Sequence, residues 1–465
     1  MATFWEQVER AARAAVAAWR GGTETETPAT PFSIYHGLID ADKQRIERYQ
    51  LLWKYYRGEH KKHLKQRMTP AGPGPDDNVI INLSRSVVNK GVYFLFGPTL
   101  EWQLDETQDT KEEGVLERIW RSKQWRQFFL AELAINGGVT GDFYMQIVPA
   151  RQGEMPRVVN LDPSIIVPHT NPDDIDDVWA YETRWRAGKT VKRTVHTKRE
   201  DGFWETFTES LVSGRWVEDM PAEVWPFDWP YIIHGKNLPN PNEFYGCSDL
   251  EDADINDAIN AVASNVNRIT RIFAHPVVWA RGFGDNLALD TSKVATTSNT
   301  DAHMDALQLA RDLSSSQEYS RYLRTAFSEV TNVPESDPDR LAIGAQSGFA
   351  LRVLFNDLVL KTGVKRNAYG LALIETNRRL LDMLGMGDNH IVKLHWGDAL
   401  PEDERATTEA DRFELDAGLA SKETISTRRG LDWKREMERM EVQNASEGNV
   451  GEMLLRAFER GSVTQ

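Results

Sequence analysis

The segment 248–273 constrains the fold of this chain most, because its apolar residues repeat at helical spacing over almost three heptads. The repeating residues stand 4, 3, 4, 3 and 4 positions apart: Ile255, Ile259, Val262, Val266, Ile269 and Phe273. This spacing is typical of an a/d seam, which needs an apolar partner along its length. A helix of this length extends on the order of 40 Å. The sequence therefore predicts a long helix with one apolar seam.

Composition limits the kind of protein that this sequence can encode. The chain has 465 residues, more than a single hydrophobic core usually supports, so several packed modules are expected. Its 55 basic and 70 acidic residues give a net charge of −15, which argues against a protein that grips DNA by neutralising phosphates. DNA could still slide past such a surface, because a wall that attracts it weakly or repels it lowers friction.

Cysteine usage and hydropathy indicate the cellular setting. Cys247 is the single cysteine, which excludes an intramolecular disulfide and a cysteine-based zinc site and favours a reducing compartment. No apolar run approaches the roughly 20 residues that span a bilayer. Charged residues within Phe4–Trp19 break a signal-peptide core. The sequence therefore predicts a soluble protein without membrane contact, which begins with a short amphipathic helix.

The first half of the chain mixes helical and strand-like patterns. A helix and a Thr/Glu/Pro linker are expected at 1–31, and a charged helix at Asp40–Tyr56. A Pro/Gly-rich loop at Thr69–Asp77 precedes a helix at Asn82–Phe96. Two helical patterns and six strand-like runs follow: Lys111–Trp125, Phe128–Asn136, Asp142–Val148, Arg157–Leu161, Val178–Trp185, Thr190–His196, Phe203–Thr208 and Tyr231–His234. The short runs and their turns predict an antiparallel α+β domain.

The second half of the chain is mainly helical. After the seam helix, the expected segments are a non-helical stretch at 274–312, a helix at Ser315–Val330, an irregular loop at Glu335–Gln346, a long helical pattern at Ser347–Leu384, a strand at Val392–Trp396 and charged helices at Glu402–Phe458. Pro276–Ala280 is strand-like within the non-helical stretch. Gly363 and Gly370 interrupt the long pattern and predict a kink.

Candidate chemistry is sparse. The best acidic cluster opens the seam helix: Asp249, Glu251, Asp252, Asp254 and Asp257. Such carboxylates could support metal-assisted hydrolysis, but at a helix start they also complement the dipole, and Ser248 or Asp249 can cap the helix. His60 and His63 have a metal-sharing spacing, yet the lysines between them repel cations. Neither a P-loop nor a GxSxG, HExxH or CxxC motif occurs, so no catalytic residue, cofactor or metal site is predicted.

Several stretches resemble the portal proteins of tailed bacteriophages, which connect head and tail. The stretches that carry the resemblance are Tyr55–Glu59, Gly91–Pro98, Pro241–Leu250, Gly397–Asp403 and Ala417–Thr424. Each one alone is unspecific, but together they follow the family's order and spacing.

The resemblance implies an α+β portal fold with a mixed wing domain, antiparallel stem helices, a small clip insertion, a long kinked helix and a C-terminal helical crown. The implied parts are an N-terminal helix and linker (1–31), the wing (32–247), stem helix 1 (248–273), the clip (274–312), stem helix 2 (313–334), a tunnel loop (335–346), the long helix with a wing return strand (347–400) and the crown (401–465).

The resemblance also assigns roles to residues. The seam of stem helix 1 would contact neighbouring subunits. DNA-facing residues of the tunnel loop would be Glu335, Asp337, Asp339, Arg340 and Gln346, which are polar and offer no base-reading geometry. Clip residues that contact terminase or adaptor would be Trp279, Arg281, Phe283 and Asp285.

The expected function is therefore that of a portal and not of an enzyme. The chain would form a homo-oligomeric ring, dodecameric by resemblance, around the DNA entry and exit channel at one capsid vertex. Its partners would be sliding double-stranded DNA, the large terminase, the major capsid protein or scaffold, and later the head-tail adaptor. It would reside in the virion, and in the host cytoplasm before assembly. Two alternatives remain: a metal-dependent phage head nuclease that uses Asp249–Asp257, and a scaffold or adaptor without a pore.

Overall fold

The computed structural model divides the chain into two compact units, Met1–Ala399 and Leu400–Gln465. The described residues are 34–60, 64, 68–69, 72–73, 77–97, 100–103, 111–121, 123–150, 154–274, 278–282, 299–306, 313–335, 352–386, 393–397, 404–428, 433, 436–437 and 440. The predicted N-terminal helix and most of the predicted tunnel loop lie outside them.

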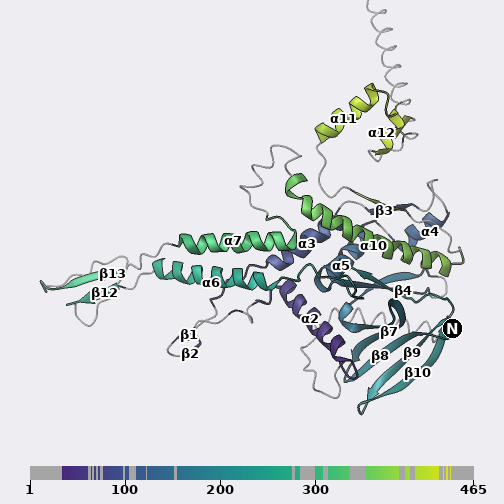
Figure 1. Ribbon diagram of the computed structural model, residues 1–465, viewed down its shortest axis with the longest axis horizontal. Helices are drawn as coiled ribbons and strands as arrows, with labels where there is room; N and C mark the ends of the chain where they lie inside the picture. The colour runs from purple at the N-terminus through teal and green to yellow at the C-terminus, as the bar shows by residue number, and fades with distance from the viewer. Residues whose placement is uncertain are drawn as a thin grey trace, which may run out of the picture. The chain divides into compact units, whose positions relative to one another are not determined.

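Two antiparallel sheets form the β part of the first unit (Figure 1). The five-stranded sheet has the order β10-β9-β8-β7-β6, with strands at Arg215–Trp225, Trp204–Val212, Thr190–Lys198, Asp174–Ala187 and Ile166–Asn171. The three-stranded sheet has the order β11-β4-β5, with strands at Ile232–Lys236, Asp142–Val148 and Arg157–Leu161. All residues of the central strand β4 are buried, as expected for a strand covered on both faces.

Five helices and a short 3-10 turn pack around the three-stranded sheet. They are α2 (Asp40–Arg57), α3 (Leu83–Phe96), α4 (Lys111–Ile119), α5 (Lys123–Thr140), η2 (Pro163–Ile165) and α10 (Asn356–Met383). α10 lies against α3 and β11, and the ring of Tyr369 stacks on Phe143 of β4 with centroids 4.1 Å apart. The largest fully buried side chains, which include Trp120 and Trp225, form one continuous core here.

α5 extends four residues past its predicted end at Asn136, and neighbours approach Gly137 and Gly138 closely in its last turn. A Cβ on Gly137 would lie 2.1 Å from the Tyr369 hydroxyl, and one on Gly138 would lie 3.0 Å from a carboxylate oxygen of Asp249. The glycine pair therefore permits close helix packing rather than ending the helix.

A buried charge cluster holds the five-stranded sheet. The carboxylate of Glu182 is 3% exposed and contacts Arg184 and Arg193, each at 2.9 Å, and His169 at 3.5 Å. Burial opposes ionisation of Glu182, but the hydrogen bond from His169 and the charge of Arg184 lower its pKa to about 2. Arg193 also lies over Trp216, 4.3 Å from the ring centroid.

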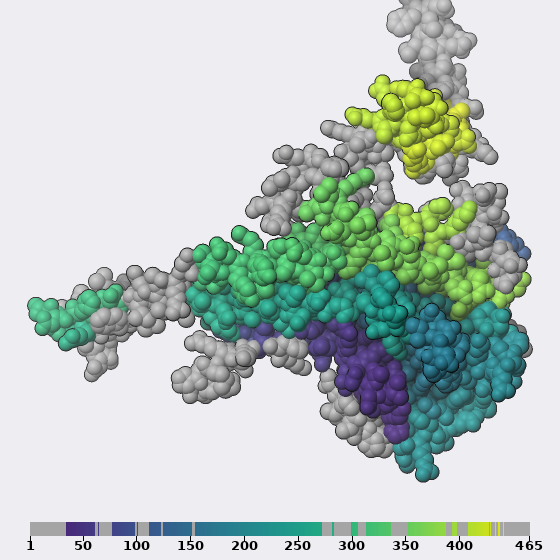
Figure 2. Space-filling model, in the orientation of Figure 1, coloured from purple at the N-terminus to yellow at the C-terminus, as the bar shows by residue number. Residues whose placement is uncertain are grey.

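A two-helix hairpin extends from this body. α6 (Asp254–Ala274) and α7 (Ser314–Thr331) run side by side, and the paired strands β12 (Val278–Arg281) and β13 (His303–Ala306) lie beyond their ends (Figure 1). In the space-filling view the hairpin forms a narrow arm beside the broad body (Figure 2).

The remaining described elements are short. β1 (Met68–Thr69) pairs with β2 (Gly72–Pro73), and β3 (Leu100–Gln103) pairs with β14 (Lys393–Trp396). The second unit contains α11 (Glu404–Asp416) and α12 (Lys422–Arg428).

The α+β class with antiparallel sheets is confirmed, and the element boundaries agree with many of the predictions. α6 begins at Asp254 rather than at Ser248, and α10 continues through Gly363 and Gly370 without a break. Six strands were not predicted: β1, β2, β3, β6, β10 and β13. β1 and β2 pair where a Pro/Gly-rich loop was predicted.

Candidate functional site

The first half of the apolar seam on α6 packs inside the chain's own core. Ile259 is fully buried, and Ile255 packs beside it. Their apolar neighbours come from α3, α7, α10 and the turn after α7: Leu83, Val87, Phe94, Leu323, Phe327, Val333, Phe355 and Leu358. α7 thus supplies part of the partner surface that the seam needs.

The second half of the seam is less covered. Three of its residues are only partly buried: Val262, Val266 and Ile269. Phe273 belongs to α6, but its side chain lies outside the described ones. On α7, Tyr319 and Tyr322 are 52% and 67% exposed, and their rings stack with centroids 6.4 Å apart. This outer half of the hairpin keeps apolar and aromatic surface accessible for a further contact.

A polar ladder on another face of α6 was not predicted. It consists of four residues at successive helical turns: Asn256, Asn260, Ser264 and Arg268. Together they bind the extended segment 77–82, which leads into α3, and the first two residues of α3. Asn260 Oδ1 accepts the Ile81 N–H at 2.8 Å, and Ser264 Oγ accepts the Val79 N–H at 2.9 Å. The guanidinium of Arg268 donates to Asp77 at 3.0 Å and to Asn78 at 2.6 Å.

Asn256 makes the densest rung of the polar ladder. Its Oδ1 accepts the N–H groups of Leu83 and Ser84, both at 3.1 Å, and the Ser84 hydroxyl at 3.0 Å. Its Nδ2 donates to the Ile81 carbonyl at 2.8 Å. Leu83 and Ser84 open α3, so this side chain satisfies N–H groups that have no partner within their own helix. The ladder thereby joins α6 to the start of α3.

The spacing of the ladder explains why helix and extended chain can match. Four helical residues rise about 6.0 Å, and two residues of extended chain rise about 6.7 Å. Residue numbers rise from Asn256 to Arg268 along α6, while the numbers of their partners fall from Ser84 to Asp77. Helix and segment therefore run antiparallel. The signal in the sequence was the polar i, i+4 set beside the seam, but nothing in it identified the partner 170 to 190 positions away.

The acidic cluster before α6 is dispersed rather than gathered. Asp249 points inward, where Lys365 Nζ and Lys361 Nζ contact its carboxylate at 2.5 and 3.0 Å. Burial would raise the pKa of Asp249, but Lys365 and Lys361 outweigh it and lower the pKa below its usual value. Its negative charge is therefore neutralised within the protein, and Asp249 does not cap α6, because the helix begins five residues later, at Asp254.

The other acidic residues of the cluster have separate surroundings. Asp257 accepts the Tyr55 hydroxyl at 2.6 Å and lies 3.1 Å from Nδ1 of buried His60. Glu251 pairs with Arg48, and the side chain of Glu251 also accepts the Ser248 N–H at 3.1 Å. Within the described ranges, no three His, Cys, Asp or Glu side chains converge as a metal ion would require. His63 lies outside those ranges.

Only one predicted tunnel-loop residue is described. Glu335 follows α7 and contacts Arg324 at 3.4 Å, while Lys90 donates to the neighbouring Pro334 carbonyl at 2.9 Å. These contacts anchor the start of the predicted loop to α7 and α3. Four predicted DNA-facing residues lie outside the described residues: Asp337, Asp339, Arg340 and Gln346.

Two of the predicted clip residues lie on β12. Trp279 pairs with Asp305 of β13, and Arg281, which is exposed, pairs with His303. The other two, Phe283 and Asp285, lie outside the described residues. Across the helices that the structure describes, none combines the length and apolar character needed to cross a bilayer.

Comparisons with known proteins give a family match and similar solved structures. Two of the similar structures match 90% of this chain and 99% of their own: the virion of a native gene transfer agent particle (13% identity, TM-score 0.43) and the neck of an empty particle of that kind, computed with C6 symmetry (12% identity, TM-score 0.42). No curated protein matches the chain. The family model for phage portal protein, SPP1 Gp6-like, matches residues 35–449. With almost the whole chain covered, this protein belongs to the SPP1 Gp6-like family of phage portal proteins.

Proposed function

We propose that this chain is the subunit of a ring that forms the DNA entry and exit channel at one vertex of a capsid. The portal family match over residues 35–449 carries this proposal. The arm formed by α6 and α7 suits it, because a ring needs one surface of each subunit to meet a different surface of the next.

In this proposal α6 and α7 form the stem, and the outer half of the hairpin supplies subunit contacts. Val262, Val266 and Ile269 are partly buried in the single chain, and Tyr319 and Tyr322 are exposed. Burial of these side chains between neighbours would stabilise the ring, since apolar area removed from water contributes about 25 cal/mol per Å². The inner seam residues Ile255 and Ile259 would instead hold each hairpin to its own subunit.

The remaining parts take the following roles. The mixed region 32–247 is the wing, 274–312 is the clip that docks terminase and later the adaptor, and 401–465 is the crown. The loop 335–346 faces the lumen. With a net charge of −15 the ring would let DNA slide instead of gripping it. A dodecamer and contact with the capsid protein or scaffold complete the proposal.

Electron microscopy of the purified full chain tests the ring. Closed rings are expected, and Val266→Asp should shift the protein toward single subunits because it places a carboxylate in the subunit contact. Asn265→Asp places the same carboxylate at an exposed position of α6 that is not assigned to the contact, so it is the matched control. Monomers at all concentrations in the unaltered protein would contradict the ring.

Deletion of Ser336–Gln346 tests the tunnel loop. The portal proposal expects rings that still form but package DNA poorly, whereas a scaffold or adaptor without a pore expects unchanged packaging. The nuclease alternative expects divalent-dependent DNA cleavage that Asp252→Ala abolishes. That alternative gains no support from Asp249, which is bound by two lysines.

A further inference from the structure

The exposed side of α10 carries three large apolar side chains. Leu360 is 63% exposed, Val364 is 43% exposed and Leu371 is 70% exposed. Their positions differ by four and seven, so the three side chains form a stripe along one side of the helix. The opposite side of α10 is buried and packs against α3 and the core. An exposed apolar stripe of this kind marks a contact with another surface.

A groove of about 480 Å³ lies beside the stripe, between α10, the end of α7 and the segment before α6. Leu360 and Val364 line it from α10, and Val330, which is 48% exposed, lines it from α7. Asp252 and Asp357 also line the groove; both are exposed, and neither forms a salt bridge with the described residues. An occupant that complements the groove therefore needs an apolar or aromatic side chain and a cation.

Gly363 borders the stripe on the exposed side of α10. A Cβ at this position would meet no described atom within 4 Å, so packing inside the subunit does not require a glycine here. Glycine in a helix interior weakens the helix relative to alanine. A second surface that packs closely on α10 from outside would account for Gly363, because a neighbouring backbone can approach a helix most closely at a glycine.

The exposed side of α3 offers the groups that the groove needs. Tyr93 is 65% exposed. Arg85, two turns earlier, is exposed, lies over the Tyr56 ring at 5.3 Å from its centroid, and forms no salt bridge with the described residues. The next residue, Phe94, faces a different side, where its ring stacks on Phe355 just before α10. The stripe and the exposed side of α3 are thus different surfaces of one chain, as a head-to-tail ring contact requires.

We propose that α3 of one subunit packs on the α10 stripe of the next, with Tyr93 in the groove and Arg85 paired with Asp357. This contact rests on the proposed ring and adds a second surface to the contact of the hairpin. Val330 lies on the same side of α7 as Tyr319, eleven positions earlier. The hairpin contact and the α10 groove would therefore form one continuous interface.

Contacts inside one subunit show how α3 and α10 are aligned. The two helices run in the same direction, and three pairs of neighbouring residues keep an offset of 272 to 274 positions: Gly91 and Lys365, Phe94 and Arg366, and Phe96 and Tyr369. This offset places Arg85 level with the first turn of α10, where Asp357 lies. It places Tyr93 within one turn of Val364.

The same alignment carries over to the contact between subunits. A rotation about the ring axis leaves the height along that axis unchanged, and in a dodecamer the next subunit is turned by only about 30°. α3 of the neighbour therefore keeps nearly the same level and direction relative to α10. Arg85 then meets Asp357, and Tyr93 meets the groove at Val364, so both contacts follow from one register.

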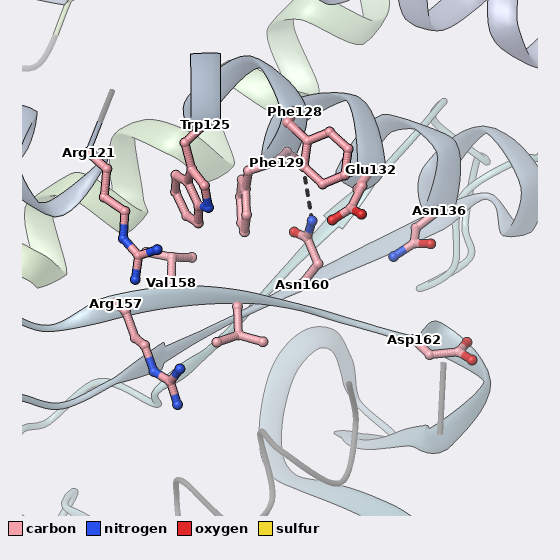
Figure 3. A pocket seen from close by; sticks show the side chains of 11 residues that line it. Arg121, Trp125, Phe128, Phe129, Glu132, Asn136, Arg157, Val158, Asn160 and Asp162 are labelled. Atoms are coloured by element: carbon pink, nitrogen blue, oxygen red, sulfur yellow. Dashed lines mark hydrogen bonds between the residues drawn. The ribbon is translucent and has the colours of Figure 1, made fainter. Parts of the chain in front are cut away.

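A second cleft provides a matched control. It measures about 280 Å³, lies between α5 and β5, and is lined by Phe128 (Figure 3). Phe128 is 64% exposed, almost the same as Tyr93. Asp162 at the same cleft is engaged within the chain, where it accepts the Ser164 N–H at 2.9 Å. The cleft forms no part of the proposed contact.

Ring formation of the purified full chain, followed by analytical ultracentrifugation over a concentration series, tests the contact. Tyr93→Asp should raise the concentration at which half of the chains are in rings by at least about tenfold, because an aromatic anchor is lost. Phe128→Asp makes a similar change at an equally exposed aromatic residue and should leave that concentration within about twofold. As single subunits, both variants should unfold at about the same urea concentration as the unaltered protein, because both side chains are exposed.

Charge exchange tests the register. Arg85→Asp and Asp357→Arg should each raise the half-assembly concentration by at least about threefold, because each places like charges opposite one another. The two substitutions combined should restore it to within about twofold of the unaltered protein, because the opposite charges then face each other again.

The outcomes separate this contact from the ring itself. If the unaltered protein forms no rings at any concentration, the proposed function fails and the contact fails with it. If rings form and Tyr93→Asp assembles as well as Phe128→Asp, the contact alone is wrong; a different protein in the groove predicts this result. The contact is also wrong if the combined charge exchange assembles no better than its single variants.

Discussion

Replacing Asn256 with alanine should free the start of α3 from α6. The substitution removes the acceptor of the Leu83 and Ser84 N–H groups and the donor to the Ile81 carbonyl. The Ser84 hydroxyl can rotate to another acceptor, so three backbone groups lose their hydrogen bond to Asn256, although the Leu83 N–H still donates to the Ile81 carbonyl at 3.1 Å. At about 1 kcal/mol for each lost hydrogen bond, opening of this segment should become easier by about 3 kcal/mol.

Amide exchange measures this opening directly. A change of about 3 kcal/mol corresponds to about 150-fold faster exchange at Leu83 and Ser84. Asn265→Ala is the matched control, since Asn265 lies on the same helix, is exposed and meets the ladder at its far end, where it accepts a hydrogen bond from Arg268 at 3.0 Å. Both substitutions gain the same helix propensity, so the difference between them isolates the contribution of Asn256. If Asn256→Ala speeds exchange less than about tenfold, or no more than Asn265→Ala does, the ladder does not hold α3.

Three further predictions concern the body of the protein. The free energy of unfolding should fall by up to about 3 kcal/mol as the pH drops from 4.5 to about 2, because the lowered pKa of Glu182 stabilises the fold only while the carboxylate is ionised. Urea unfolding measured at a series of pH values should show this fall, and Glu182→Gln should reduce it. Lys365→Met should cost about 3–5 kcal/mol in urea unfolding by weakening the pairing of buried Asp249, and adding Asp249→Leu should recover part of it. Gly137→Ala should cost about 1–3 kcal/mol in the same assay, and Tyr369→Phe in that background should relieve the clash; a further loss would contradict it.

The sequence predicted elements whose signals are local. The residue that caps α3, Asn82, accepts the Arg85 N–H at 2.9 Å, and Gly58 ends α2 in a left-handed conformation. Both signals lie within a few residues of the boundary they set. The apolar seam on α6 could be predicted equally well, because the spacing of its residues lies within a single helix.

Features that depend on distant partners could not be predicted in this way. Asn256 and Asn260 appeared only as polar residues beside the seam, because their hydrogen bonds join groups more than 170 positions apart. β10 was missed because it is an edge strand with Pro221 and two register shifts, so its exposure lacks regular alternation. Asp249 was considered as a helix cap, but Lys361 and Lys365 lie more than 100 positions downstream.

The polar ladder can continue over only a limited length of α6, because the helix and the extended chain rise by different amounts from one rung to the next. Each interval between rungs adds about 0.7 Å of offset, so three intervals from Asn256 to Arg268 accumulate about 2 Å. The short side chains Asn256, Asn260 and Ser264 suffice for the first rungs, and the long side chain of Arg268 bridges the last. A fifth rung built from a short side chain would fall outside hydrogen-bonding range. The difference in rise per rung therefore limits how far along α6 the extended segment can bind the hairpin. Beyond Arg268 the ladder does not restrain α6, so this part of the helix can bend or contact other partners.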